Sequence, residues 1–115
     1  MLVIVAPGQG SQTPGFLNPW LELPGFKQSL TEMSDASGLD LASFGTTADA
    51  DTIRDTAVAQ PLIVAAGVAS LAELLRGTSP SEAGIAGVAG HSVGEITAAI
   101  AAGIFSPQDG IRFVK

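Results

Sequence analysis

The sequence predicts an α/β fold with short parallel strands. Two short apolar runs, Leu2–Ala6 and Ile85–Ala89, have the composition of strands that are buried on both faces of a parallel sheet. Apolar residues at helical spacing fill much of the chain between the two runs, and a glycine-rich turn and another helical pattern follow the second run. Strands that alternate with helices are typical of a parallel sheet, so we expect one small α/β domain.

Composition excludes several classes of protein. The chain has 115 residues, of which 46% are hydrophobic and 14% are charged, and its formal net charge is -6 with only five scattered basic residues. A nucleic-acid-binding protein needs a basic patch to neutralise phosphates, so no nucleic-acid partner is expected. The absence of cysteine and the single histidine exclude a disulfide framework and a thiol nucleophile, and they argue against a metal centre.

The apolar segments do not have the features of membrane or export signals. The N-terminal "MLVIVAPGQG" has a short apolar run without a preceding basic region, so it does not predict a signal peptide. The longest apolar stretches contain Gln60, Pro61 and Glu73, or His91 and Glu95, whereas a membrane span needs about 20 predominantly apolar residues. We therefore expect a cytoplasmic location and no membrane partner.

The first half of the chain is predicted to contain one loop, one helix and a second, polar loop. Prolines and glycines interrupt residues 7–25 too often for a long helix, and Trp20 is expected to anchor this loop by packing. Apolar residues at i, i+4 and i+7 predict a helix over 26–37, with Gly38 at its C-terminal cap. Residues 40–55 are rich in aspartate and threonine and are expected to form a solvated loop with room for a helical turn.

The second half is predicted to be mostly helical. Residues 56–77 are apolar almost all round, which indicates a mostly buried central helix of about four turns with Pro61 near its first turn and Gly77 at its end. A flexible connection, "GTSPSEAG", precedes the second strand. The segment "EITAAIAAGIF" predicts a helix that runs to Gly103.

The last ten residues predict the start of one more helix. In "SPQDGIRFVK", Ser106 can cap the helix and Pro107 occupies its first position. The sequence stops inside this amphipathic pattern, so we expect that the chain is part of a longer protein.

The segment "AGHSVGE", residues 89–95, contains a G-x-S-x-G pattern. In a nucleophile elbow the serine stands on a tight turn between a strand and a helix, with small residues two positions to either side. Gly90 and Gly94 meet that demand, Ser92 is the candidate nucleophile, and the backbone N–H of Val93 is the natural first donor to an oxyanion. The alternative is a glycine-rich turn that contains a serine by chance, and the strand–turn–helix setting favours the elbow.

The loop "PGQGSQ", residues 7–12, is the candidate source of the second oxyanion donor. If the two strands run parallel, the backbone of Gln9 reaches the same end of the sheet as Ser92, and Gly8 and Gly10 allow the loop to approach a substrate closely. A dinucleotide-binding loop is the rival interpretation. It is disfavoured because Thr13 replaces the third glycine of that motif and no helix is predicted to follow.

Three segments together carry a resemblance to a known family. "APGQGSQTPG", "DTAVAQPLIVAAG" and "AGHSVGEITAAIAAG", in this order and at these distances, closely resemble malonyl-CoA:acyl carrier protein transacylases and the acyltransferase domains of polyketide and fatty acid synthases. The resemblance covers essentially the whole chain. It implies that residues 1–115 are the N-terminal part of an α/β-hydrolase-like large subdomain, and that the family's ferredoxin-like small subdomain is absent from this chain.

The resemblance also implies a reaction. Ser92 would take a malonyl group from coenzyme A and hold it as an ester until the phosphopantetheine thiol of an acyl carrier protein collects it. The N–H groups of Gln9 and Val93 would form the oxyanion hole, Gln60 would help to orient the surrounding loops, and His91 would have an orienting or packing role. No metal or redox cofactor is implied. The family's general-base histidine and carboxylate-binding arginine would lie beyond Lys115, so efficient turnover is not expected of this chain alone, in which oxyanion stabilisation would recover only part of the rate.

Other functions remain open from the sequence alone. A close variant is an acyltransferase of a polyketide pathway. A serine hydrolase could use the same elbow and release acyl groups to water, although the "GQGSQ" and "AQP" motifs count against it. The third alternative is a non-catalytic fragment that binds an acyl carrier protein.

Overall fold

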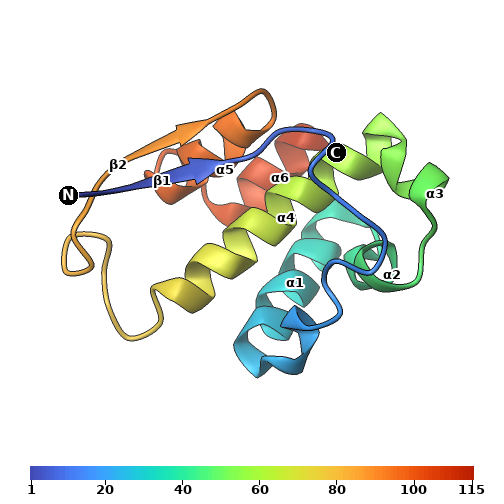
Figure 1. Cartoon of the computed structure of the whole chain (residues 1–115), viewed down its shortest axis with the longest axis horizontal. Coiled ribbons are helices and arrows are strands. Elements are labelled where there is room, and N and C mark those ends of the chain that lie inside the picture. Colours follow the sequence, from blue (N-terminus) through green and yellow to red (C-terminus); the bar gives the residue numbers. More distant parts are fainter.

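The computed structural model describes residues 1–115 as a mixed α/β structure, in which helices pack along one side of a two-stranded parallel sheet (Figure 1). The strands are β1 (Leu2–Ala6) and β2 (Ile85–Gly90), and a short 3-10 turn spans Trp20–Glu22. The six helices are α1 (Pro24–Ser37), α2 (Leu41–Thr46), α3 (Ala50–Arg54), α4 (Thr56–Leu74), α5 (Gly94–Ala101) and α6 (Pro107–Val114).

The parallel pairing of β1 and β2 positions the candidate site. Leu2 pairs with Ile85 and Ala6 pairs with Gly90, so both strands end at the same edge of the sheet. The loop after β1 and the turn after β2 therefore start side by side, although about 80 residues separate them in sequence. The prediction of short parallel strands is confirmed.

The expectation that both strands are buried on both faces is wrong for this chain. Val5 is 75% exposed, and Leu2 and Val3 are also exposed, whereas Ala6 is buried. The sheet has only two strands, and α5 packs against both of them on one face. The outward-facing side chains of β1 consequently have no layer above them.

Helix α1 confirms the predicted apolar face and the predicted cap. It begins at Pro24, two residues before the expected start, because proline suits the first turn of a helix. Gly38 follows the helix in the left-handed conformation with φ of 74°. Trp20 lies against Phe26 with 5.2 Å between ring centroids, which confirms that Trp20 anchors the first loop by packing.

The region from residue 40 to residue 55 differs from the predicted solvated loop. It forms two short helices, α2 and α3, each of which begins after an aspartate cap. The carboxylate of Asp40 accepts a hydrogen bond from the N–H of Ser43, and the carboxylate of Asp49 accepts one from the N–H of Thr52. Each helix also buries one apolar residue, Leu41 or Ile53. The aspartates therefore begin helices rather than only solvating a loop.

Helix α4 is the central helix, as predicted; it has more turns than the expected four, although it ends three residues before the expected end at Gly77. Its 19 residues make about five turns. Asp55 caps its first turn, so Pro61 lies inside the helix rather than near its start, and Gly77 stands after the helix has ended at Leu74. The helix is long and apolar enough to cross a membrane by length and composition alone. It packs against five other helices, which is typical of a core helix.

The last two helices agree closely with the sequence patterns. Helix α5 ends at Ala101, two residues before Gly103, which adopts a φ of 81°. The hydroxyl of Ser106 accepts a hydrogen bond from the N–H of Asp109 at 3.1 Å, and Pro107 is the first residue of α6. The Nζ of Lys115 donates to the carbonyl oxygen of Ser37, which joins the end of α6 to the end of α1.

Candidate active site

Ser92 occupies a strained turn between β2 and α5. Its φ is 57°, and it is the only non-glycine residue of the chain with a positive φ. The left-handed conformation is unfavourable for a residue with a Cβ and persists only where the surrounding structure enforces it. The Ser92 residue is exposed, so its hydroxyl stands at the surface of the turn. This combination of strand, strained serine and helix is the geometry of a nucleophile elbow.

The glycines that flank Ser92 have no room for a side chain. A Cβ on Gly90 would overlap the backbone of Gly94, and a Cβ on Gly94 would overlap the carbonyl oxygen of Ala6. Both obstacles are backbone atoms, which cannot rotate away as a side chain can. The tight passage from β2 to α5 therefore requires glycine at both positions.

The backbone around the elbow leaves the N–H groups of Ser92 and Val93 without a protein acceptor. The N–H of His91 donates to Ala6, the N–H of Gly94 donates to His91, and the N–H of Glu95 donates to Ser92. The N–H of Val93 donates to no protein acceptor, although the Val93 residue itself is buried. It lies at the start of α5, where the helix dipole favours negative charge.

The first loop lies directly against this turn. A Cβ on Gly8 would come within 2.6 Å of the carbonyl oxygen of His91 and 3.3 Å of the Ser92 Cβ, so only a glycine allows this approach. The next residue, Gln9, is exposed, and its backbone N–H donates to no acceptor. Gly10 has a φ of 109°, a conformation that favours glycine. The structure thus brings Gly8 and Ser92 into contact and places the free N–H of Gln9 one residue along the loop.

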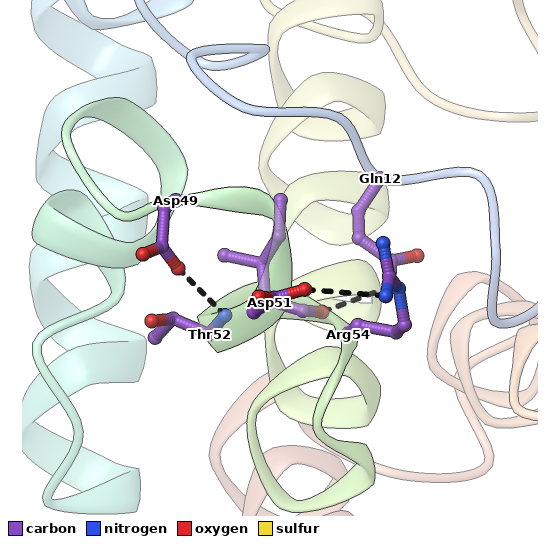
Figure 2. A network of polar contacts seen from close by, with 6 residues as sticks. Gln12, Asp49, Asp51, Thr52 and Arg54 are labelled. Atoms are coloured by element: carbon purple, nitrogen blue, oxygen red, sulfur yellow. Dashed lines mark hydrogen bonds and ion pairs between the residues drawn. The ribbon is translucent and has the colours of Figure 1, made fainter.

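Side-chain hydrogen bonds connect the first loop to the helices. The Nε2 of Gln9 donates to the Thr56 hydroxyl at 3.1 Å. The Nε2 of Gln12 donates to the carbonyl oxygen of Ile53 at 2.9 Å, and its Oε1 accepts from the N–H of Gly10 at 2.9 Å. Figure 2 shows Gln12 reaching from the loop toward α3. Neither Gln12 nor Thr56 was predicted to contribute to the site. The only signal for Gln12 is a second glutamine at the end of "GQGSQ".

His91 and Gln60 are not joined to Ser92 by any hydrogen bond. The His91 ring lies beside Gly8, where its Nδ1 would be 3.0 Å from a Cβ on that glycine, and its side chain makes no hydrogen bond. Gln60 is half-buried on α4, one turn after Thr56, and its side chain also makes no hydrogen bond. In this structure neither residue is placed to take a proton from Ser92.

Few charged groups surround the elbow. Glu95, in the first turn of α5, is exposed and forms no ion pair. The structure contains no group of three or more potential metal ligands. The one clear shift in acidity lies at the N-cap of α3, where hydrogen bonds from the side chain and backbone of Thr52 lower the pKa of Asp49. Figure 2 shows the bond from the Thr52 N–H to the Asp49 carboxylate. The polar groups available at the turn are therefore a serine hydroxyl and backbone N–H groups.

A cavity of about 290 Å³ lies behind the elbow, between the sheet and helices α4 and α5. Its lining is mostly apolar and includes Ala6, Val88 and Thr97, but not Ser92. The hydroxyl of Thr97 is buried and has no hydrogen-bond partner. Ser92 is exposed and does not line this cavity, so the candidate site is the exposed turn.

Comparisons with known proteins show which family the chain resembles in sequence and fold. The malonyl CoA-acyl carrier protein transacylase of Mycobacterium tuberculosis is 50% identical over 111 residues, which are 96% of this chain and 36% of that protein. The crystal structure of MCAT from Mycobacterium tuberculosis matches with a TM-score of 0.84 and 48% identity, over 97% of this chain and 37% of that one.

A third match is a complex of a type II PKS acyl-carrier protein with its malonyl-transacylase, with a TM-score of 0.83 and 32% identity over 97% of this chain and 36% of that one. The chain thus spans little more than a third of the length of these relatives. The model of the acyl transferase domain matches residues 3–115. The chain therefore belongs to the acyl transferase domain family.

Proposed function

We propose that this chain carries the nucleophile and the oxyanion site of a malonyl-CoA:acyl carrier protein transacylase. The observation that carries the proposal is Ser92, held at a φ of 57° between two glycines and packed against Gly8 of the first loop. A strained, exposed serine at a strand-to-helix turn is the arrangement that serine acyltransferases use to present a nucleophile. The relatives named as malonyl CoA-acyl carrier protein transacylases supply the substrate class.

The proposed reaction proceeds through an acyl-enzyme. The Ser92 oxygen attacks the thioester carbonyl of malonyl-CoA, the carbon–sulfur bond breaks, and coenzyme A leaves as its thiol with the proton that the hydroxyl gives up. The phosphopantetheine thiol of an acyl carrier protein then attacks the ester, and Ser92 regains its proton. The free N–H groups of Val93 and Gln9 are suited to hold the negative oxygen in both tetrahedral intermediates.

The remaining predicted residues have supporting roles in this proposal. Gly90 and Gly94 shape the elbow, and Gly8 and Gly10 shape the loop that faces it. His91 packs against Gly8 rather than acting as the base. Gln60 lies on α4, next to the turn of that helix that binds the loop, and we keep for it the orienting role that the resemblance implies.

The catalytic base and the carboxylate-binding arginine are proposed from the family resemblance. The base and the arginine that binds the malonyl carboxylate are expected outside residues 1–115, in a longer α/β-hydrolase-like large subdomain of which these residues form the N-terminal part. Neither a metal nor a redox cofactor is required, because the reaction exchanges one acyl acceptor for another. We propose a cytoplasmic enzyme of fatty acid synthesis, or of a polyketide pathway as a close variant.

A transfer experiment tests this function. The chain is incubated with malonyl-CoA and a phosphopantetheine-bearing acyl carrier protein, and mass spectrometry measures malonyl thioester on the carrier. We expect slow transfer above the uncatalysed rate, which Ser92→Ala abolishes and Ser81→Ala, at an exposed serine in the connection before β2, leaves unchanged. Equal transfer by the wild-type chain and Ser92→Ala would contradict the proposal, and release of malonate to water in place of transfer would indicate a hydrolase.

A further inference from the structure

The first loop has few interactions that could hold its backbone in place. Residues 7–19 contain no helix or strand, and Gly8, Gly10 and Gly15 make the segment intrinsically pliable. The hydroxyl and the N–H of Ser11 bond only to the nearby carbonyl oxygen of Gly8. The position of Gln9 relative to Ser92 therefore depends on hydrogen bonds that connect this loop to other elements.

Gln12 connects the first loop to α3 through both ends of its side-chain amide. Its Oε1 accepts from the N–H of Gly10 while its Nε2 donates to the carbonyl oxygen of Ile53, each at 2.9 Å. The two bonds need opposite ends of one amide, so they fix the orientation of the whole side chain. Ile53 is 2% exposed, and its hydrogen bond with Gln12 is partly buried, which makes it less open to competition from water than the exposed bond between Gln9 and Thr56.

The peptide unit of Gln9 is thus held from both sides. On one side Gly8 lies against the carbonyl oxygen of His91 and the Cβ of Ser92. On the other side the N–H of Gly10 is bound by Gln12, which is itself bound to the core at Ile53. The N–H of Gln9 donates to no acceptor, and Gln9 stands between Gly8 and Gly10 along the chain. An error of about 1 Å in the placement of such a donor can slow a reaction by about two orders of magnitude.

We infer that Gln12 is a positioning residue for the reaction of Ser92, because it holds the loop at the distance where the N–H of Gln9 can stabilise an oxyanion. This inference rests on the proposed function. It adds Gln12 as a residue that influences the reaction of Ser92 without touching Ser92. Gln12 touches neither Ser92 nor the Ser92 turn by hydrogen bond. It acts on the reacting group only through the backbone of residues 8–10.

Two substitutions of Gln12, together with one control substitution elsewhere in the full chain, isolate this role. Gln12→Leu keeps the approximate volume of the side chain but removes both hydrogen bonds. Gln28→Leu makes the same change at an exposed position of α1 where the side chain forms no hydrogen bond, and it serves as the matched control. Gln12→Glu retains an acceptor for the N–H of Gly10 and places a carboxylate against the carbonyl oxygen of Ile53, so it separates the two bonds.

The test uses an alkyl fluorophosphonate, which requires neither malonyl recognition nor a carrier protein. The Ser92 oxygen bonds to phosphorus, the phosphorus–fluorine bond breaks, fluoride leaves, and the hydroxyl proton passes to solvent. Mass spectrometry gives the labelling rate at Ser92, with Ser92→Ala as background. Hydrogen exchange followed by NMR gives the protection of the Gly10 amide, and thermal unfolding reports whether each variant folds.

We expect Gln12→Leu to slow labelling by about 10-fold or more and to raise amide exchange at Gly10 by about 5-fold, with a thermal midpoint close to that of Gln28→Leu. Gln12→Glu should keep part of the Gly10 protection but still slow the labelling. Unchanged labelling in a folded Gln12→Leu chain, with or without faster exchange at Gly10, would overturn the positioning role alone. Absence of labelling above background in the wild-type chain would instead remove the proposed nucleophile, and the positioning role with it.

Discussion

Gly8 lies directly against Ser92, because a Cβ on the glycine would come within 3.3 Å of the Ser92 Cβ and 2.6 Å of the carbonyl oxygen of His91. The first loop and the elbow are therefore in contact without an intervening side chain. This contact connects two segments that are distant in sequence, and it depends on the parallel pairing of β1 with β2. The chemistry proposed for Ser92 depends on the same contact.

Gly8→Ala should displace the first loop and slow the reaction of Ser92. The added methyl group meets a backbone carbonyl that cannot rotate away, so the loop must move by several tenths of an ångström. We expect the labelling rate of Ser92 to fall by about 10-fold or more and the free energy of unfolding to fall by about 1–3 kcal/mol. Gly87→Ala on β2, where a Cβ meets nothing within 4 Å, is the control and should change neither quantity appreciably.

Ser92→Gly should stabilise the chain while it removes the proposed nucleophile. Glycine adopts a φ of 57° without the steric cost that serine bears, although it also increases the entropy of the unfolded chain. We expect a net gain of about 0.5–1 kcal/mol in the free energy of unfolding, measured by urea titration. Ser81→Gly, at a residue without positive φ, should instead lower stability slightly. A loss of stability in Ser92→Gly would argue against a strained elbow.

Thr97→Val should also stabilise the chain. The buried hydroxyl of Thr97 has no hydrogen-bond partner, and its replacement by a methyl group of similar size removes that cost. We expect the free energy of unfolding to rise by about 1 kcal/mol. Thr97→Ser is the complementary variant: it keeps the unpaired hydroxyl and removes the methyl group that packs against Gly67, so it should be less stable than the wild type.

The cap of α3 should make stability depend on acid pH. Hydrogen bonds from the side chain and backbone of Thr52 lower the pKa of Asp49 below its ordinary value of 3.8 in the folded chain. Because the pKa of Asp49 is lower in the folded chain, its ionised carboxylate contributes to the stability of the fold. This contribution is present above pH 3.8 and is lost as the pH falls through the folded pKa. Asp49→Asn retains a cap that does not titrate. The difference in thermal midpoint between the wild type and this variant should therefore change below about pH 4 and stay constant above about pH 5.

The elements near Ser92 were predictable because their signals are local. A short apolar run, a glycine-flanked serine and a small-residue helix pattern follow one another directly, and the structure has a strand, a turn and a helix in that order. The caps at Gly38 and Ser106 were predictable for the same reason. Each depends on a few neighbouring residues and on backbone geometry that only certain residue types allow.

The features that the sequence analysis missed depend on contacts between distant residues. Gln12 and Ile53 are separated by 41 positions, and Gln9 and Thr56 by 47, so no local pattern predicts their hydrogen bonds. Helices α2 and α3 were missed because the aspartates that cap them resemble those of a solvated loop. The exposure of Val5 depends on how many strands and layers surround β1, which the composition of one strand does not encode.

Whether Ser92 is an acyl nucleophile is measured by the intact mass of the chain after exposure to malonyl-CoA, followed by peptide mapping. We expect an increase by the mass of one malonyl group, located on Ser92, that hydroxylamine removes and that Ser92→Ala does not acquire. If the chain gains no malonyl group, or if Ser92→Ala gains it equally, Ser92 is not the nucleophile.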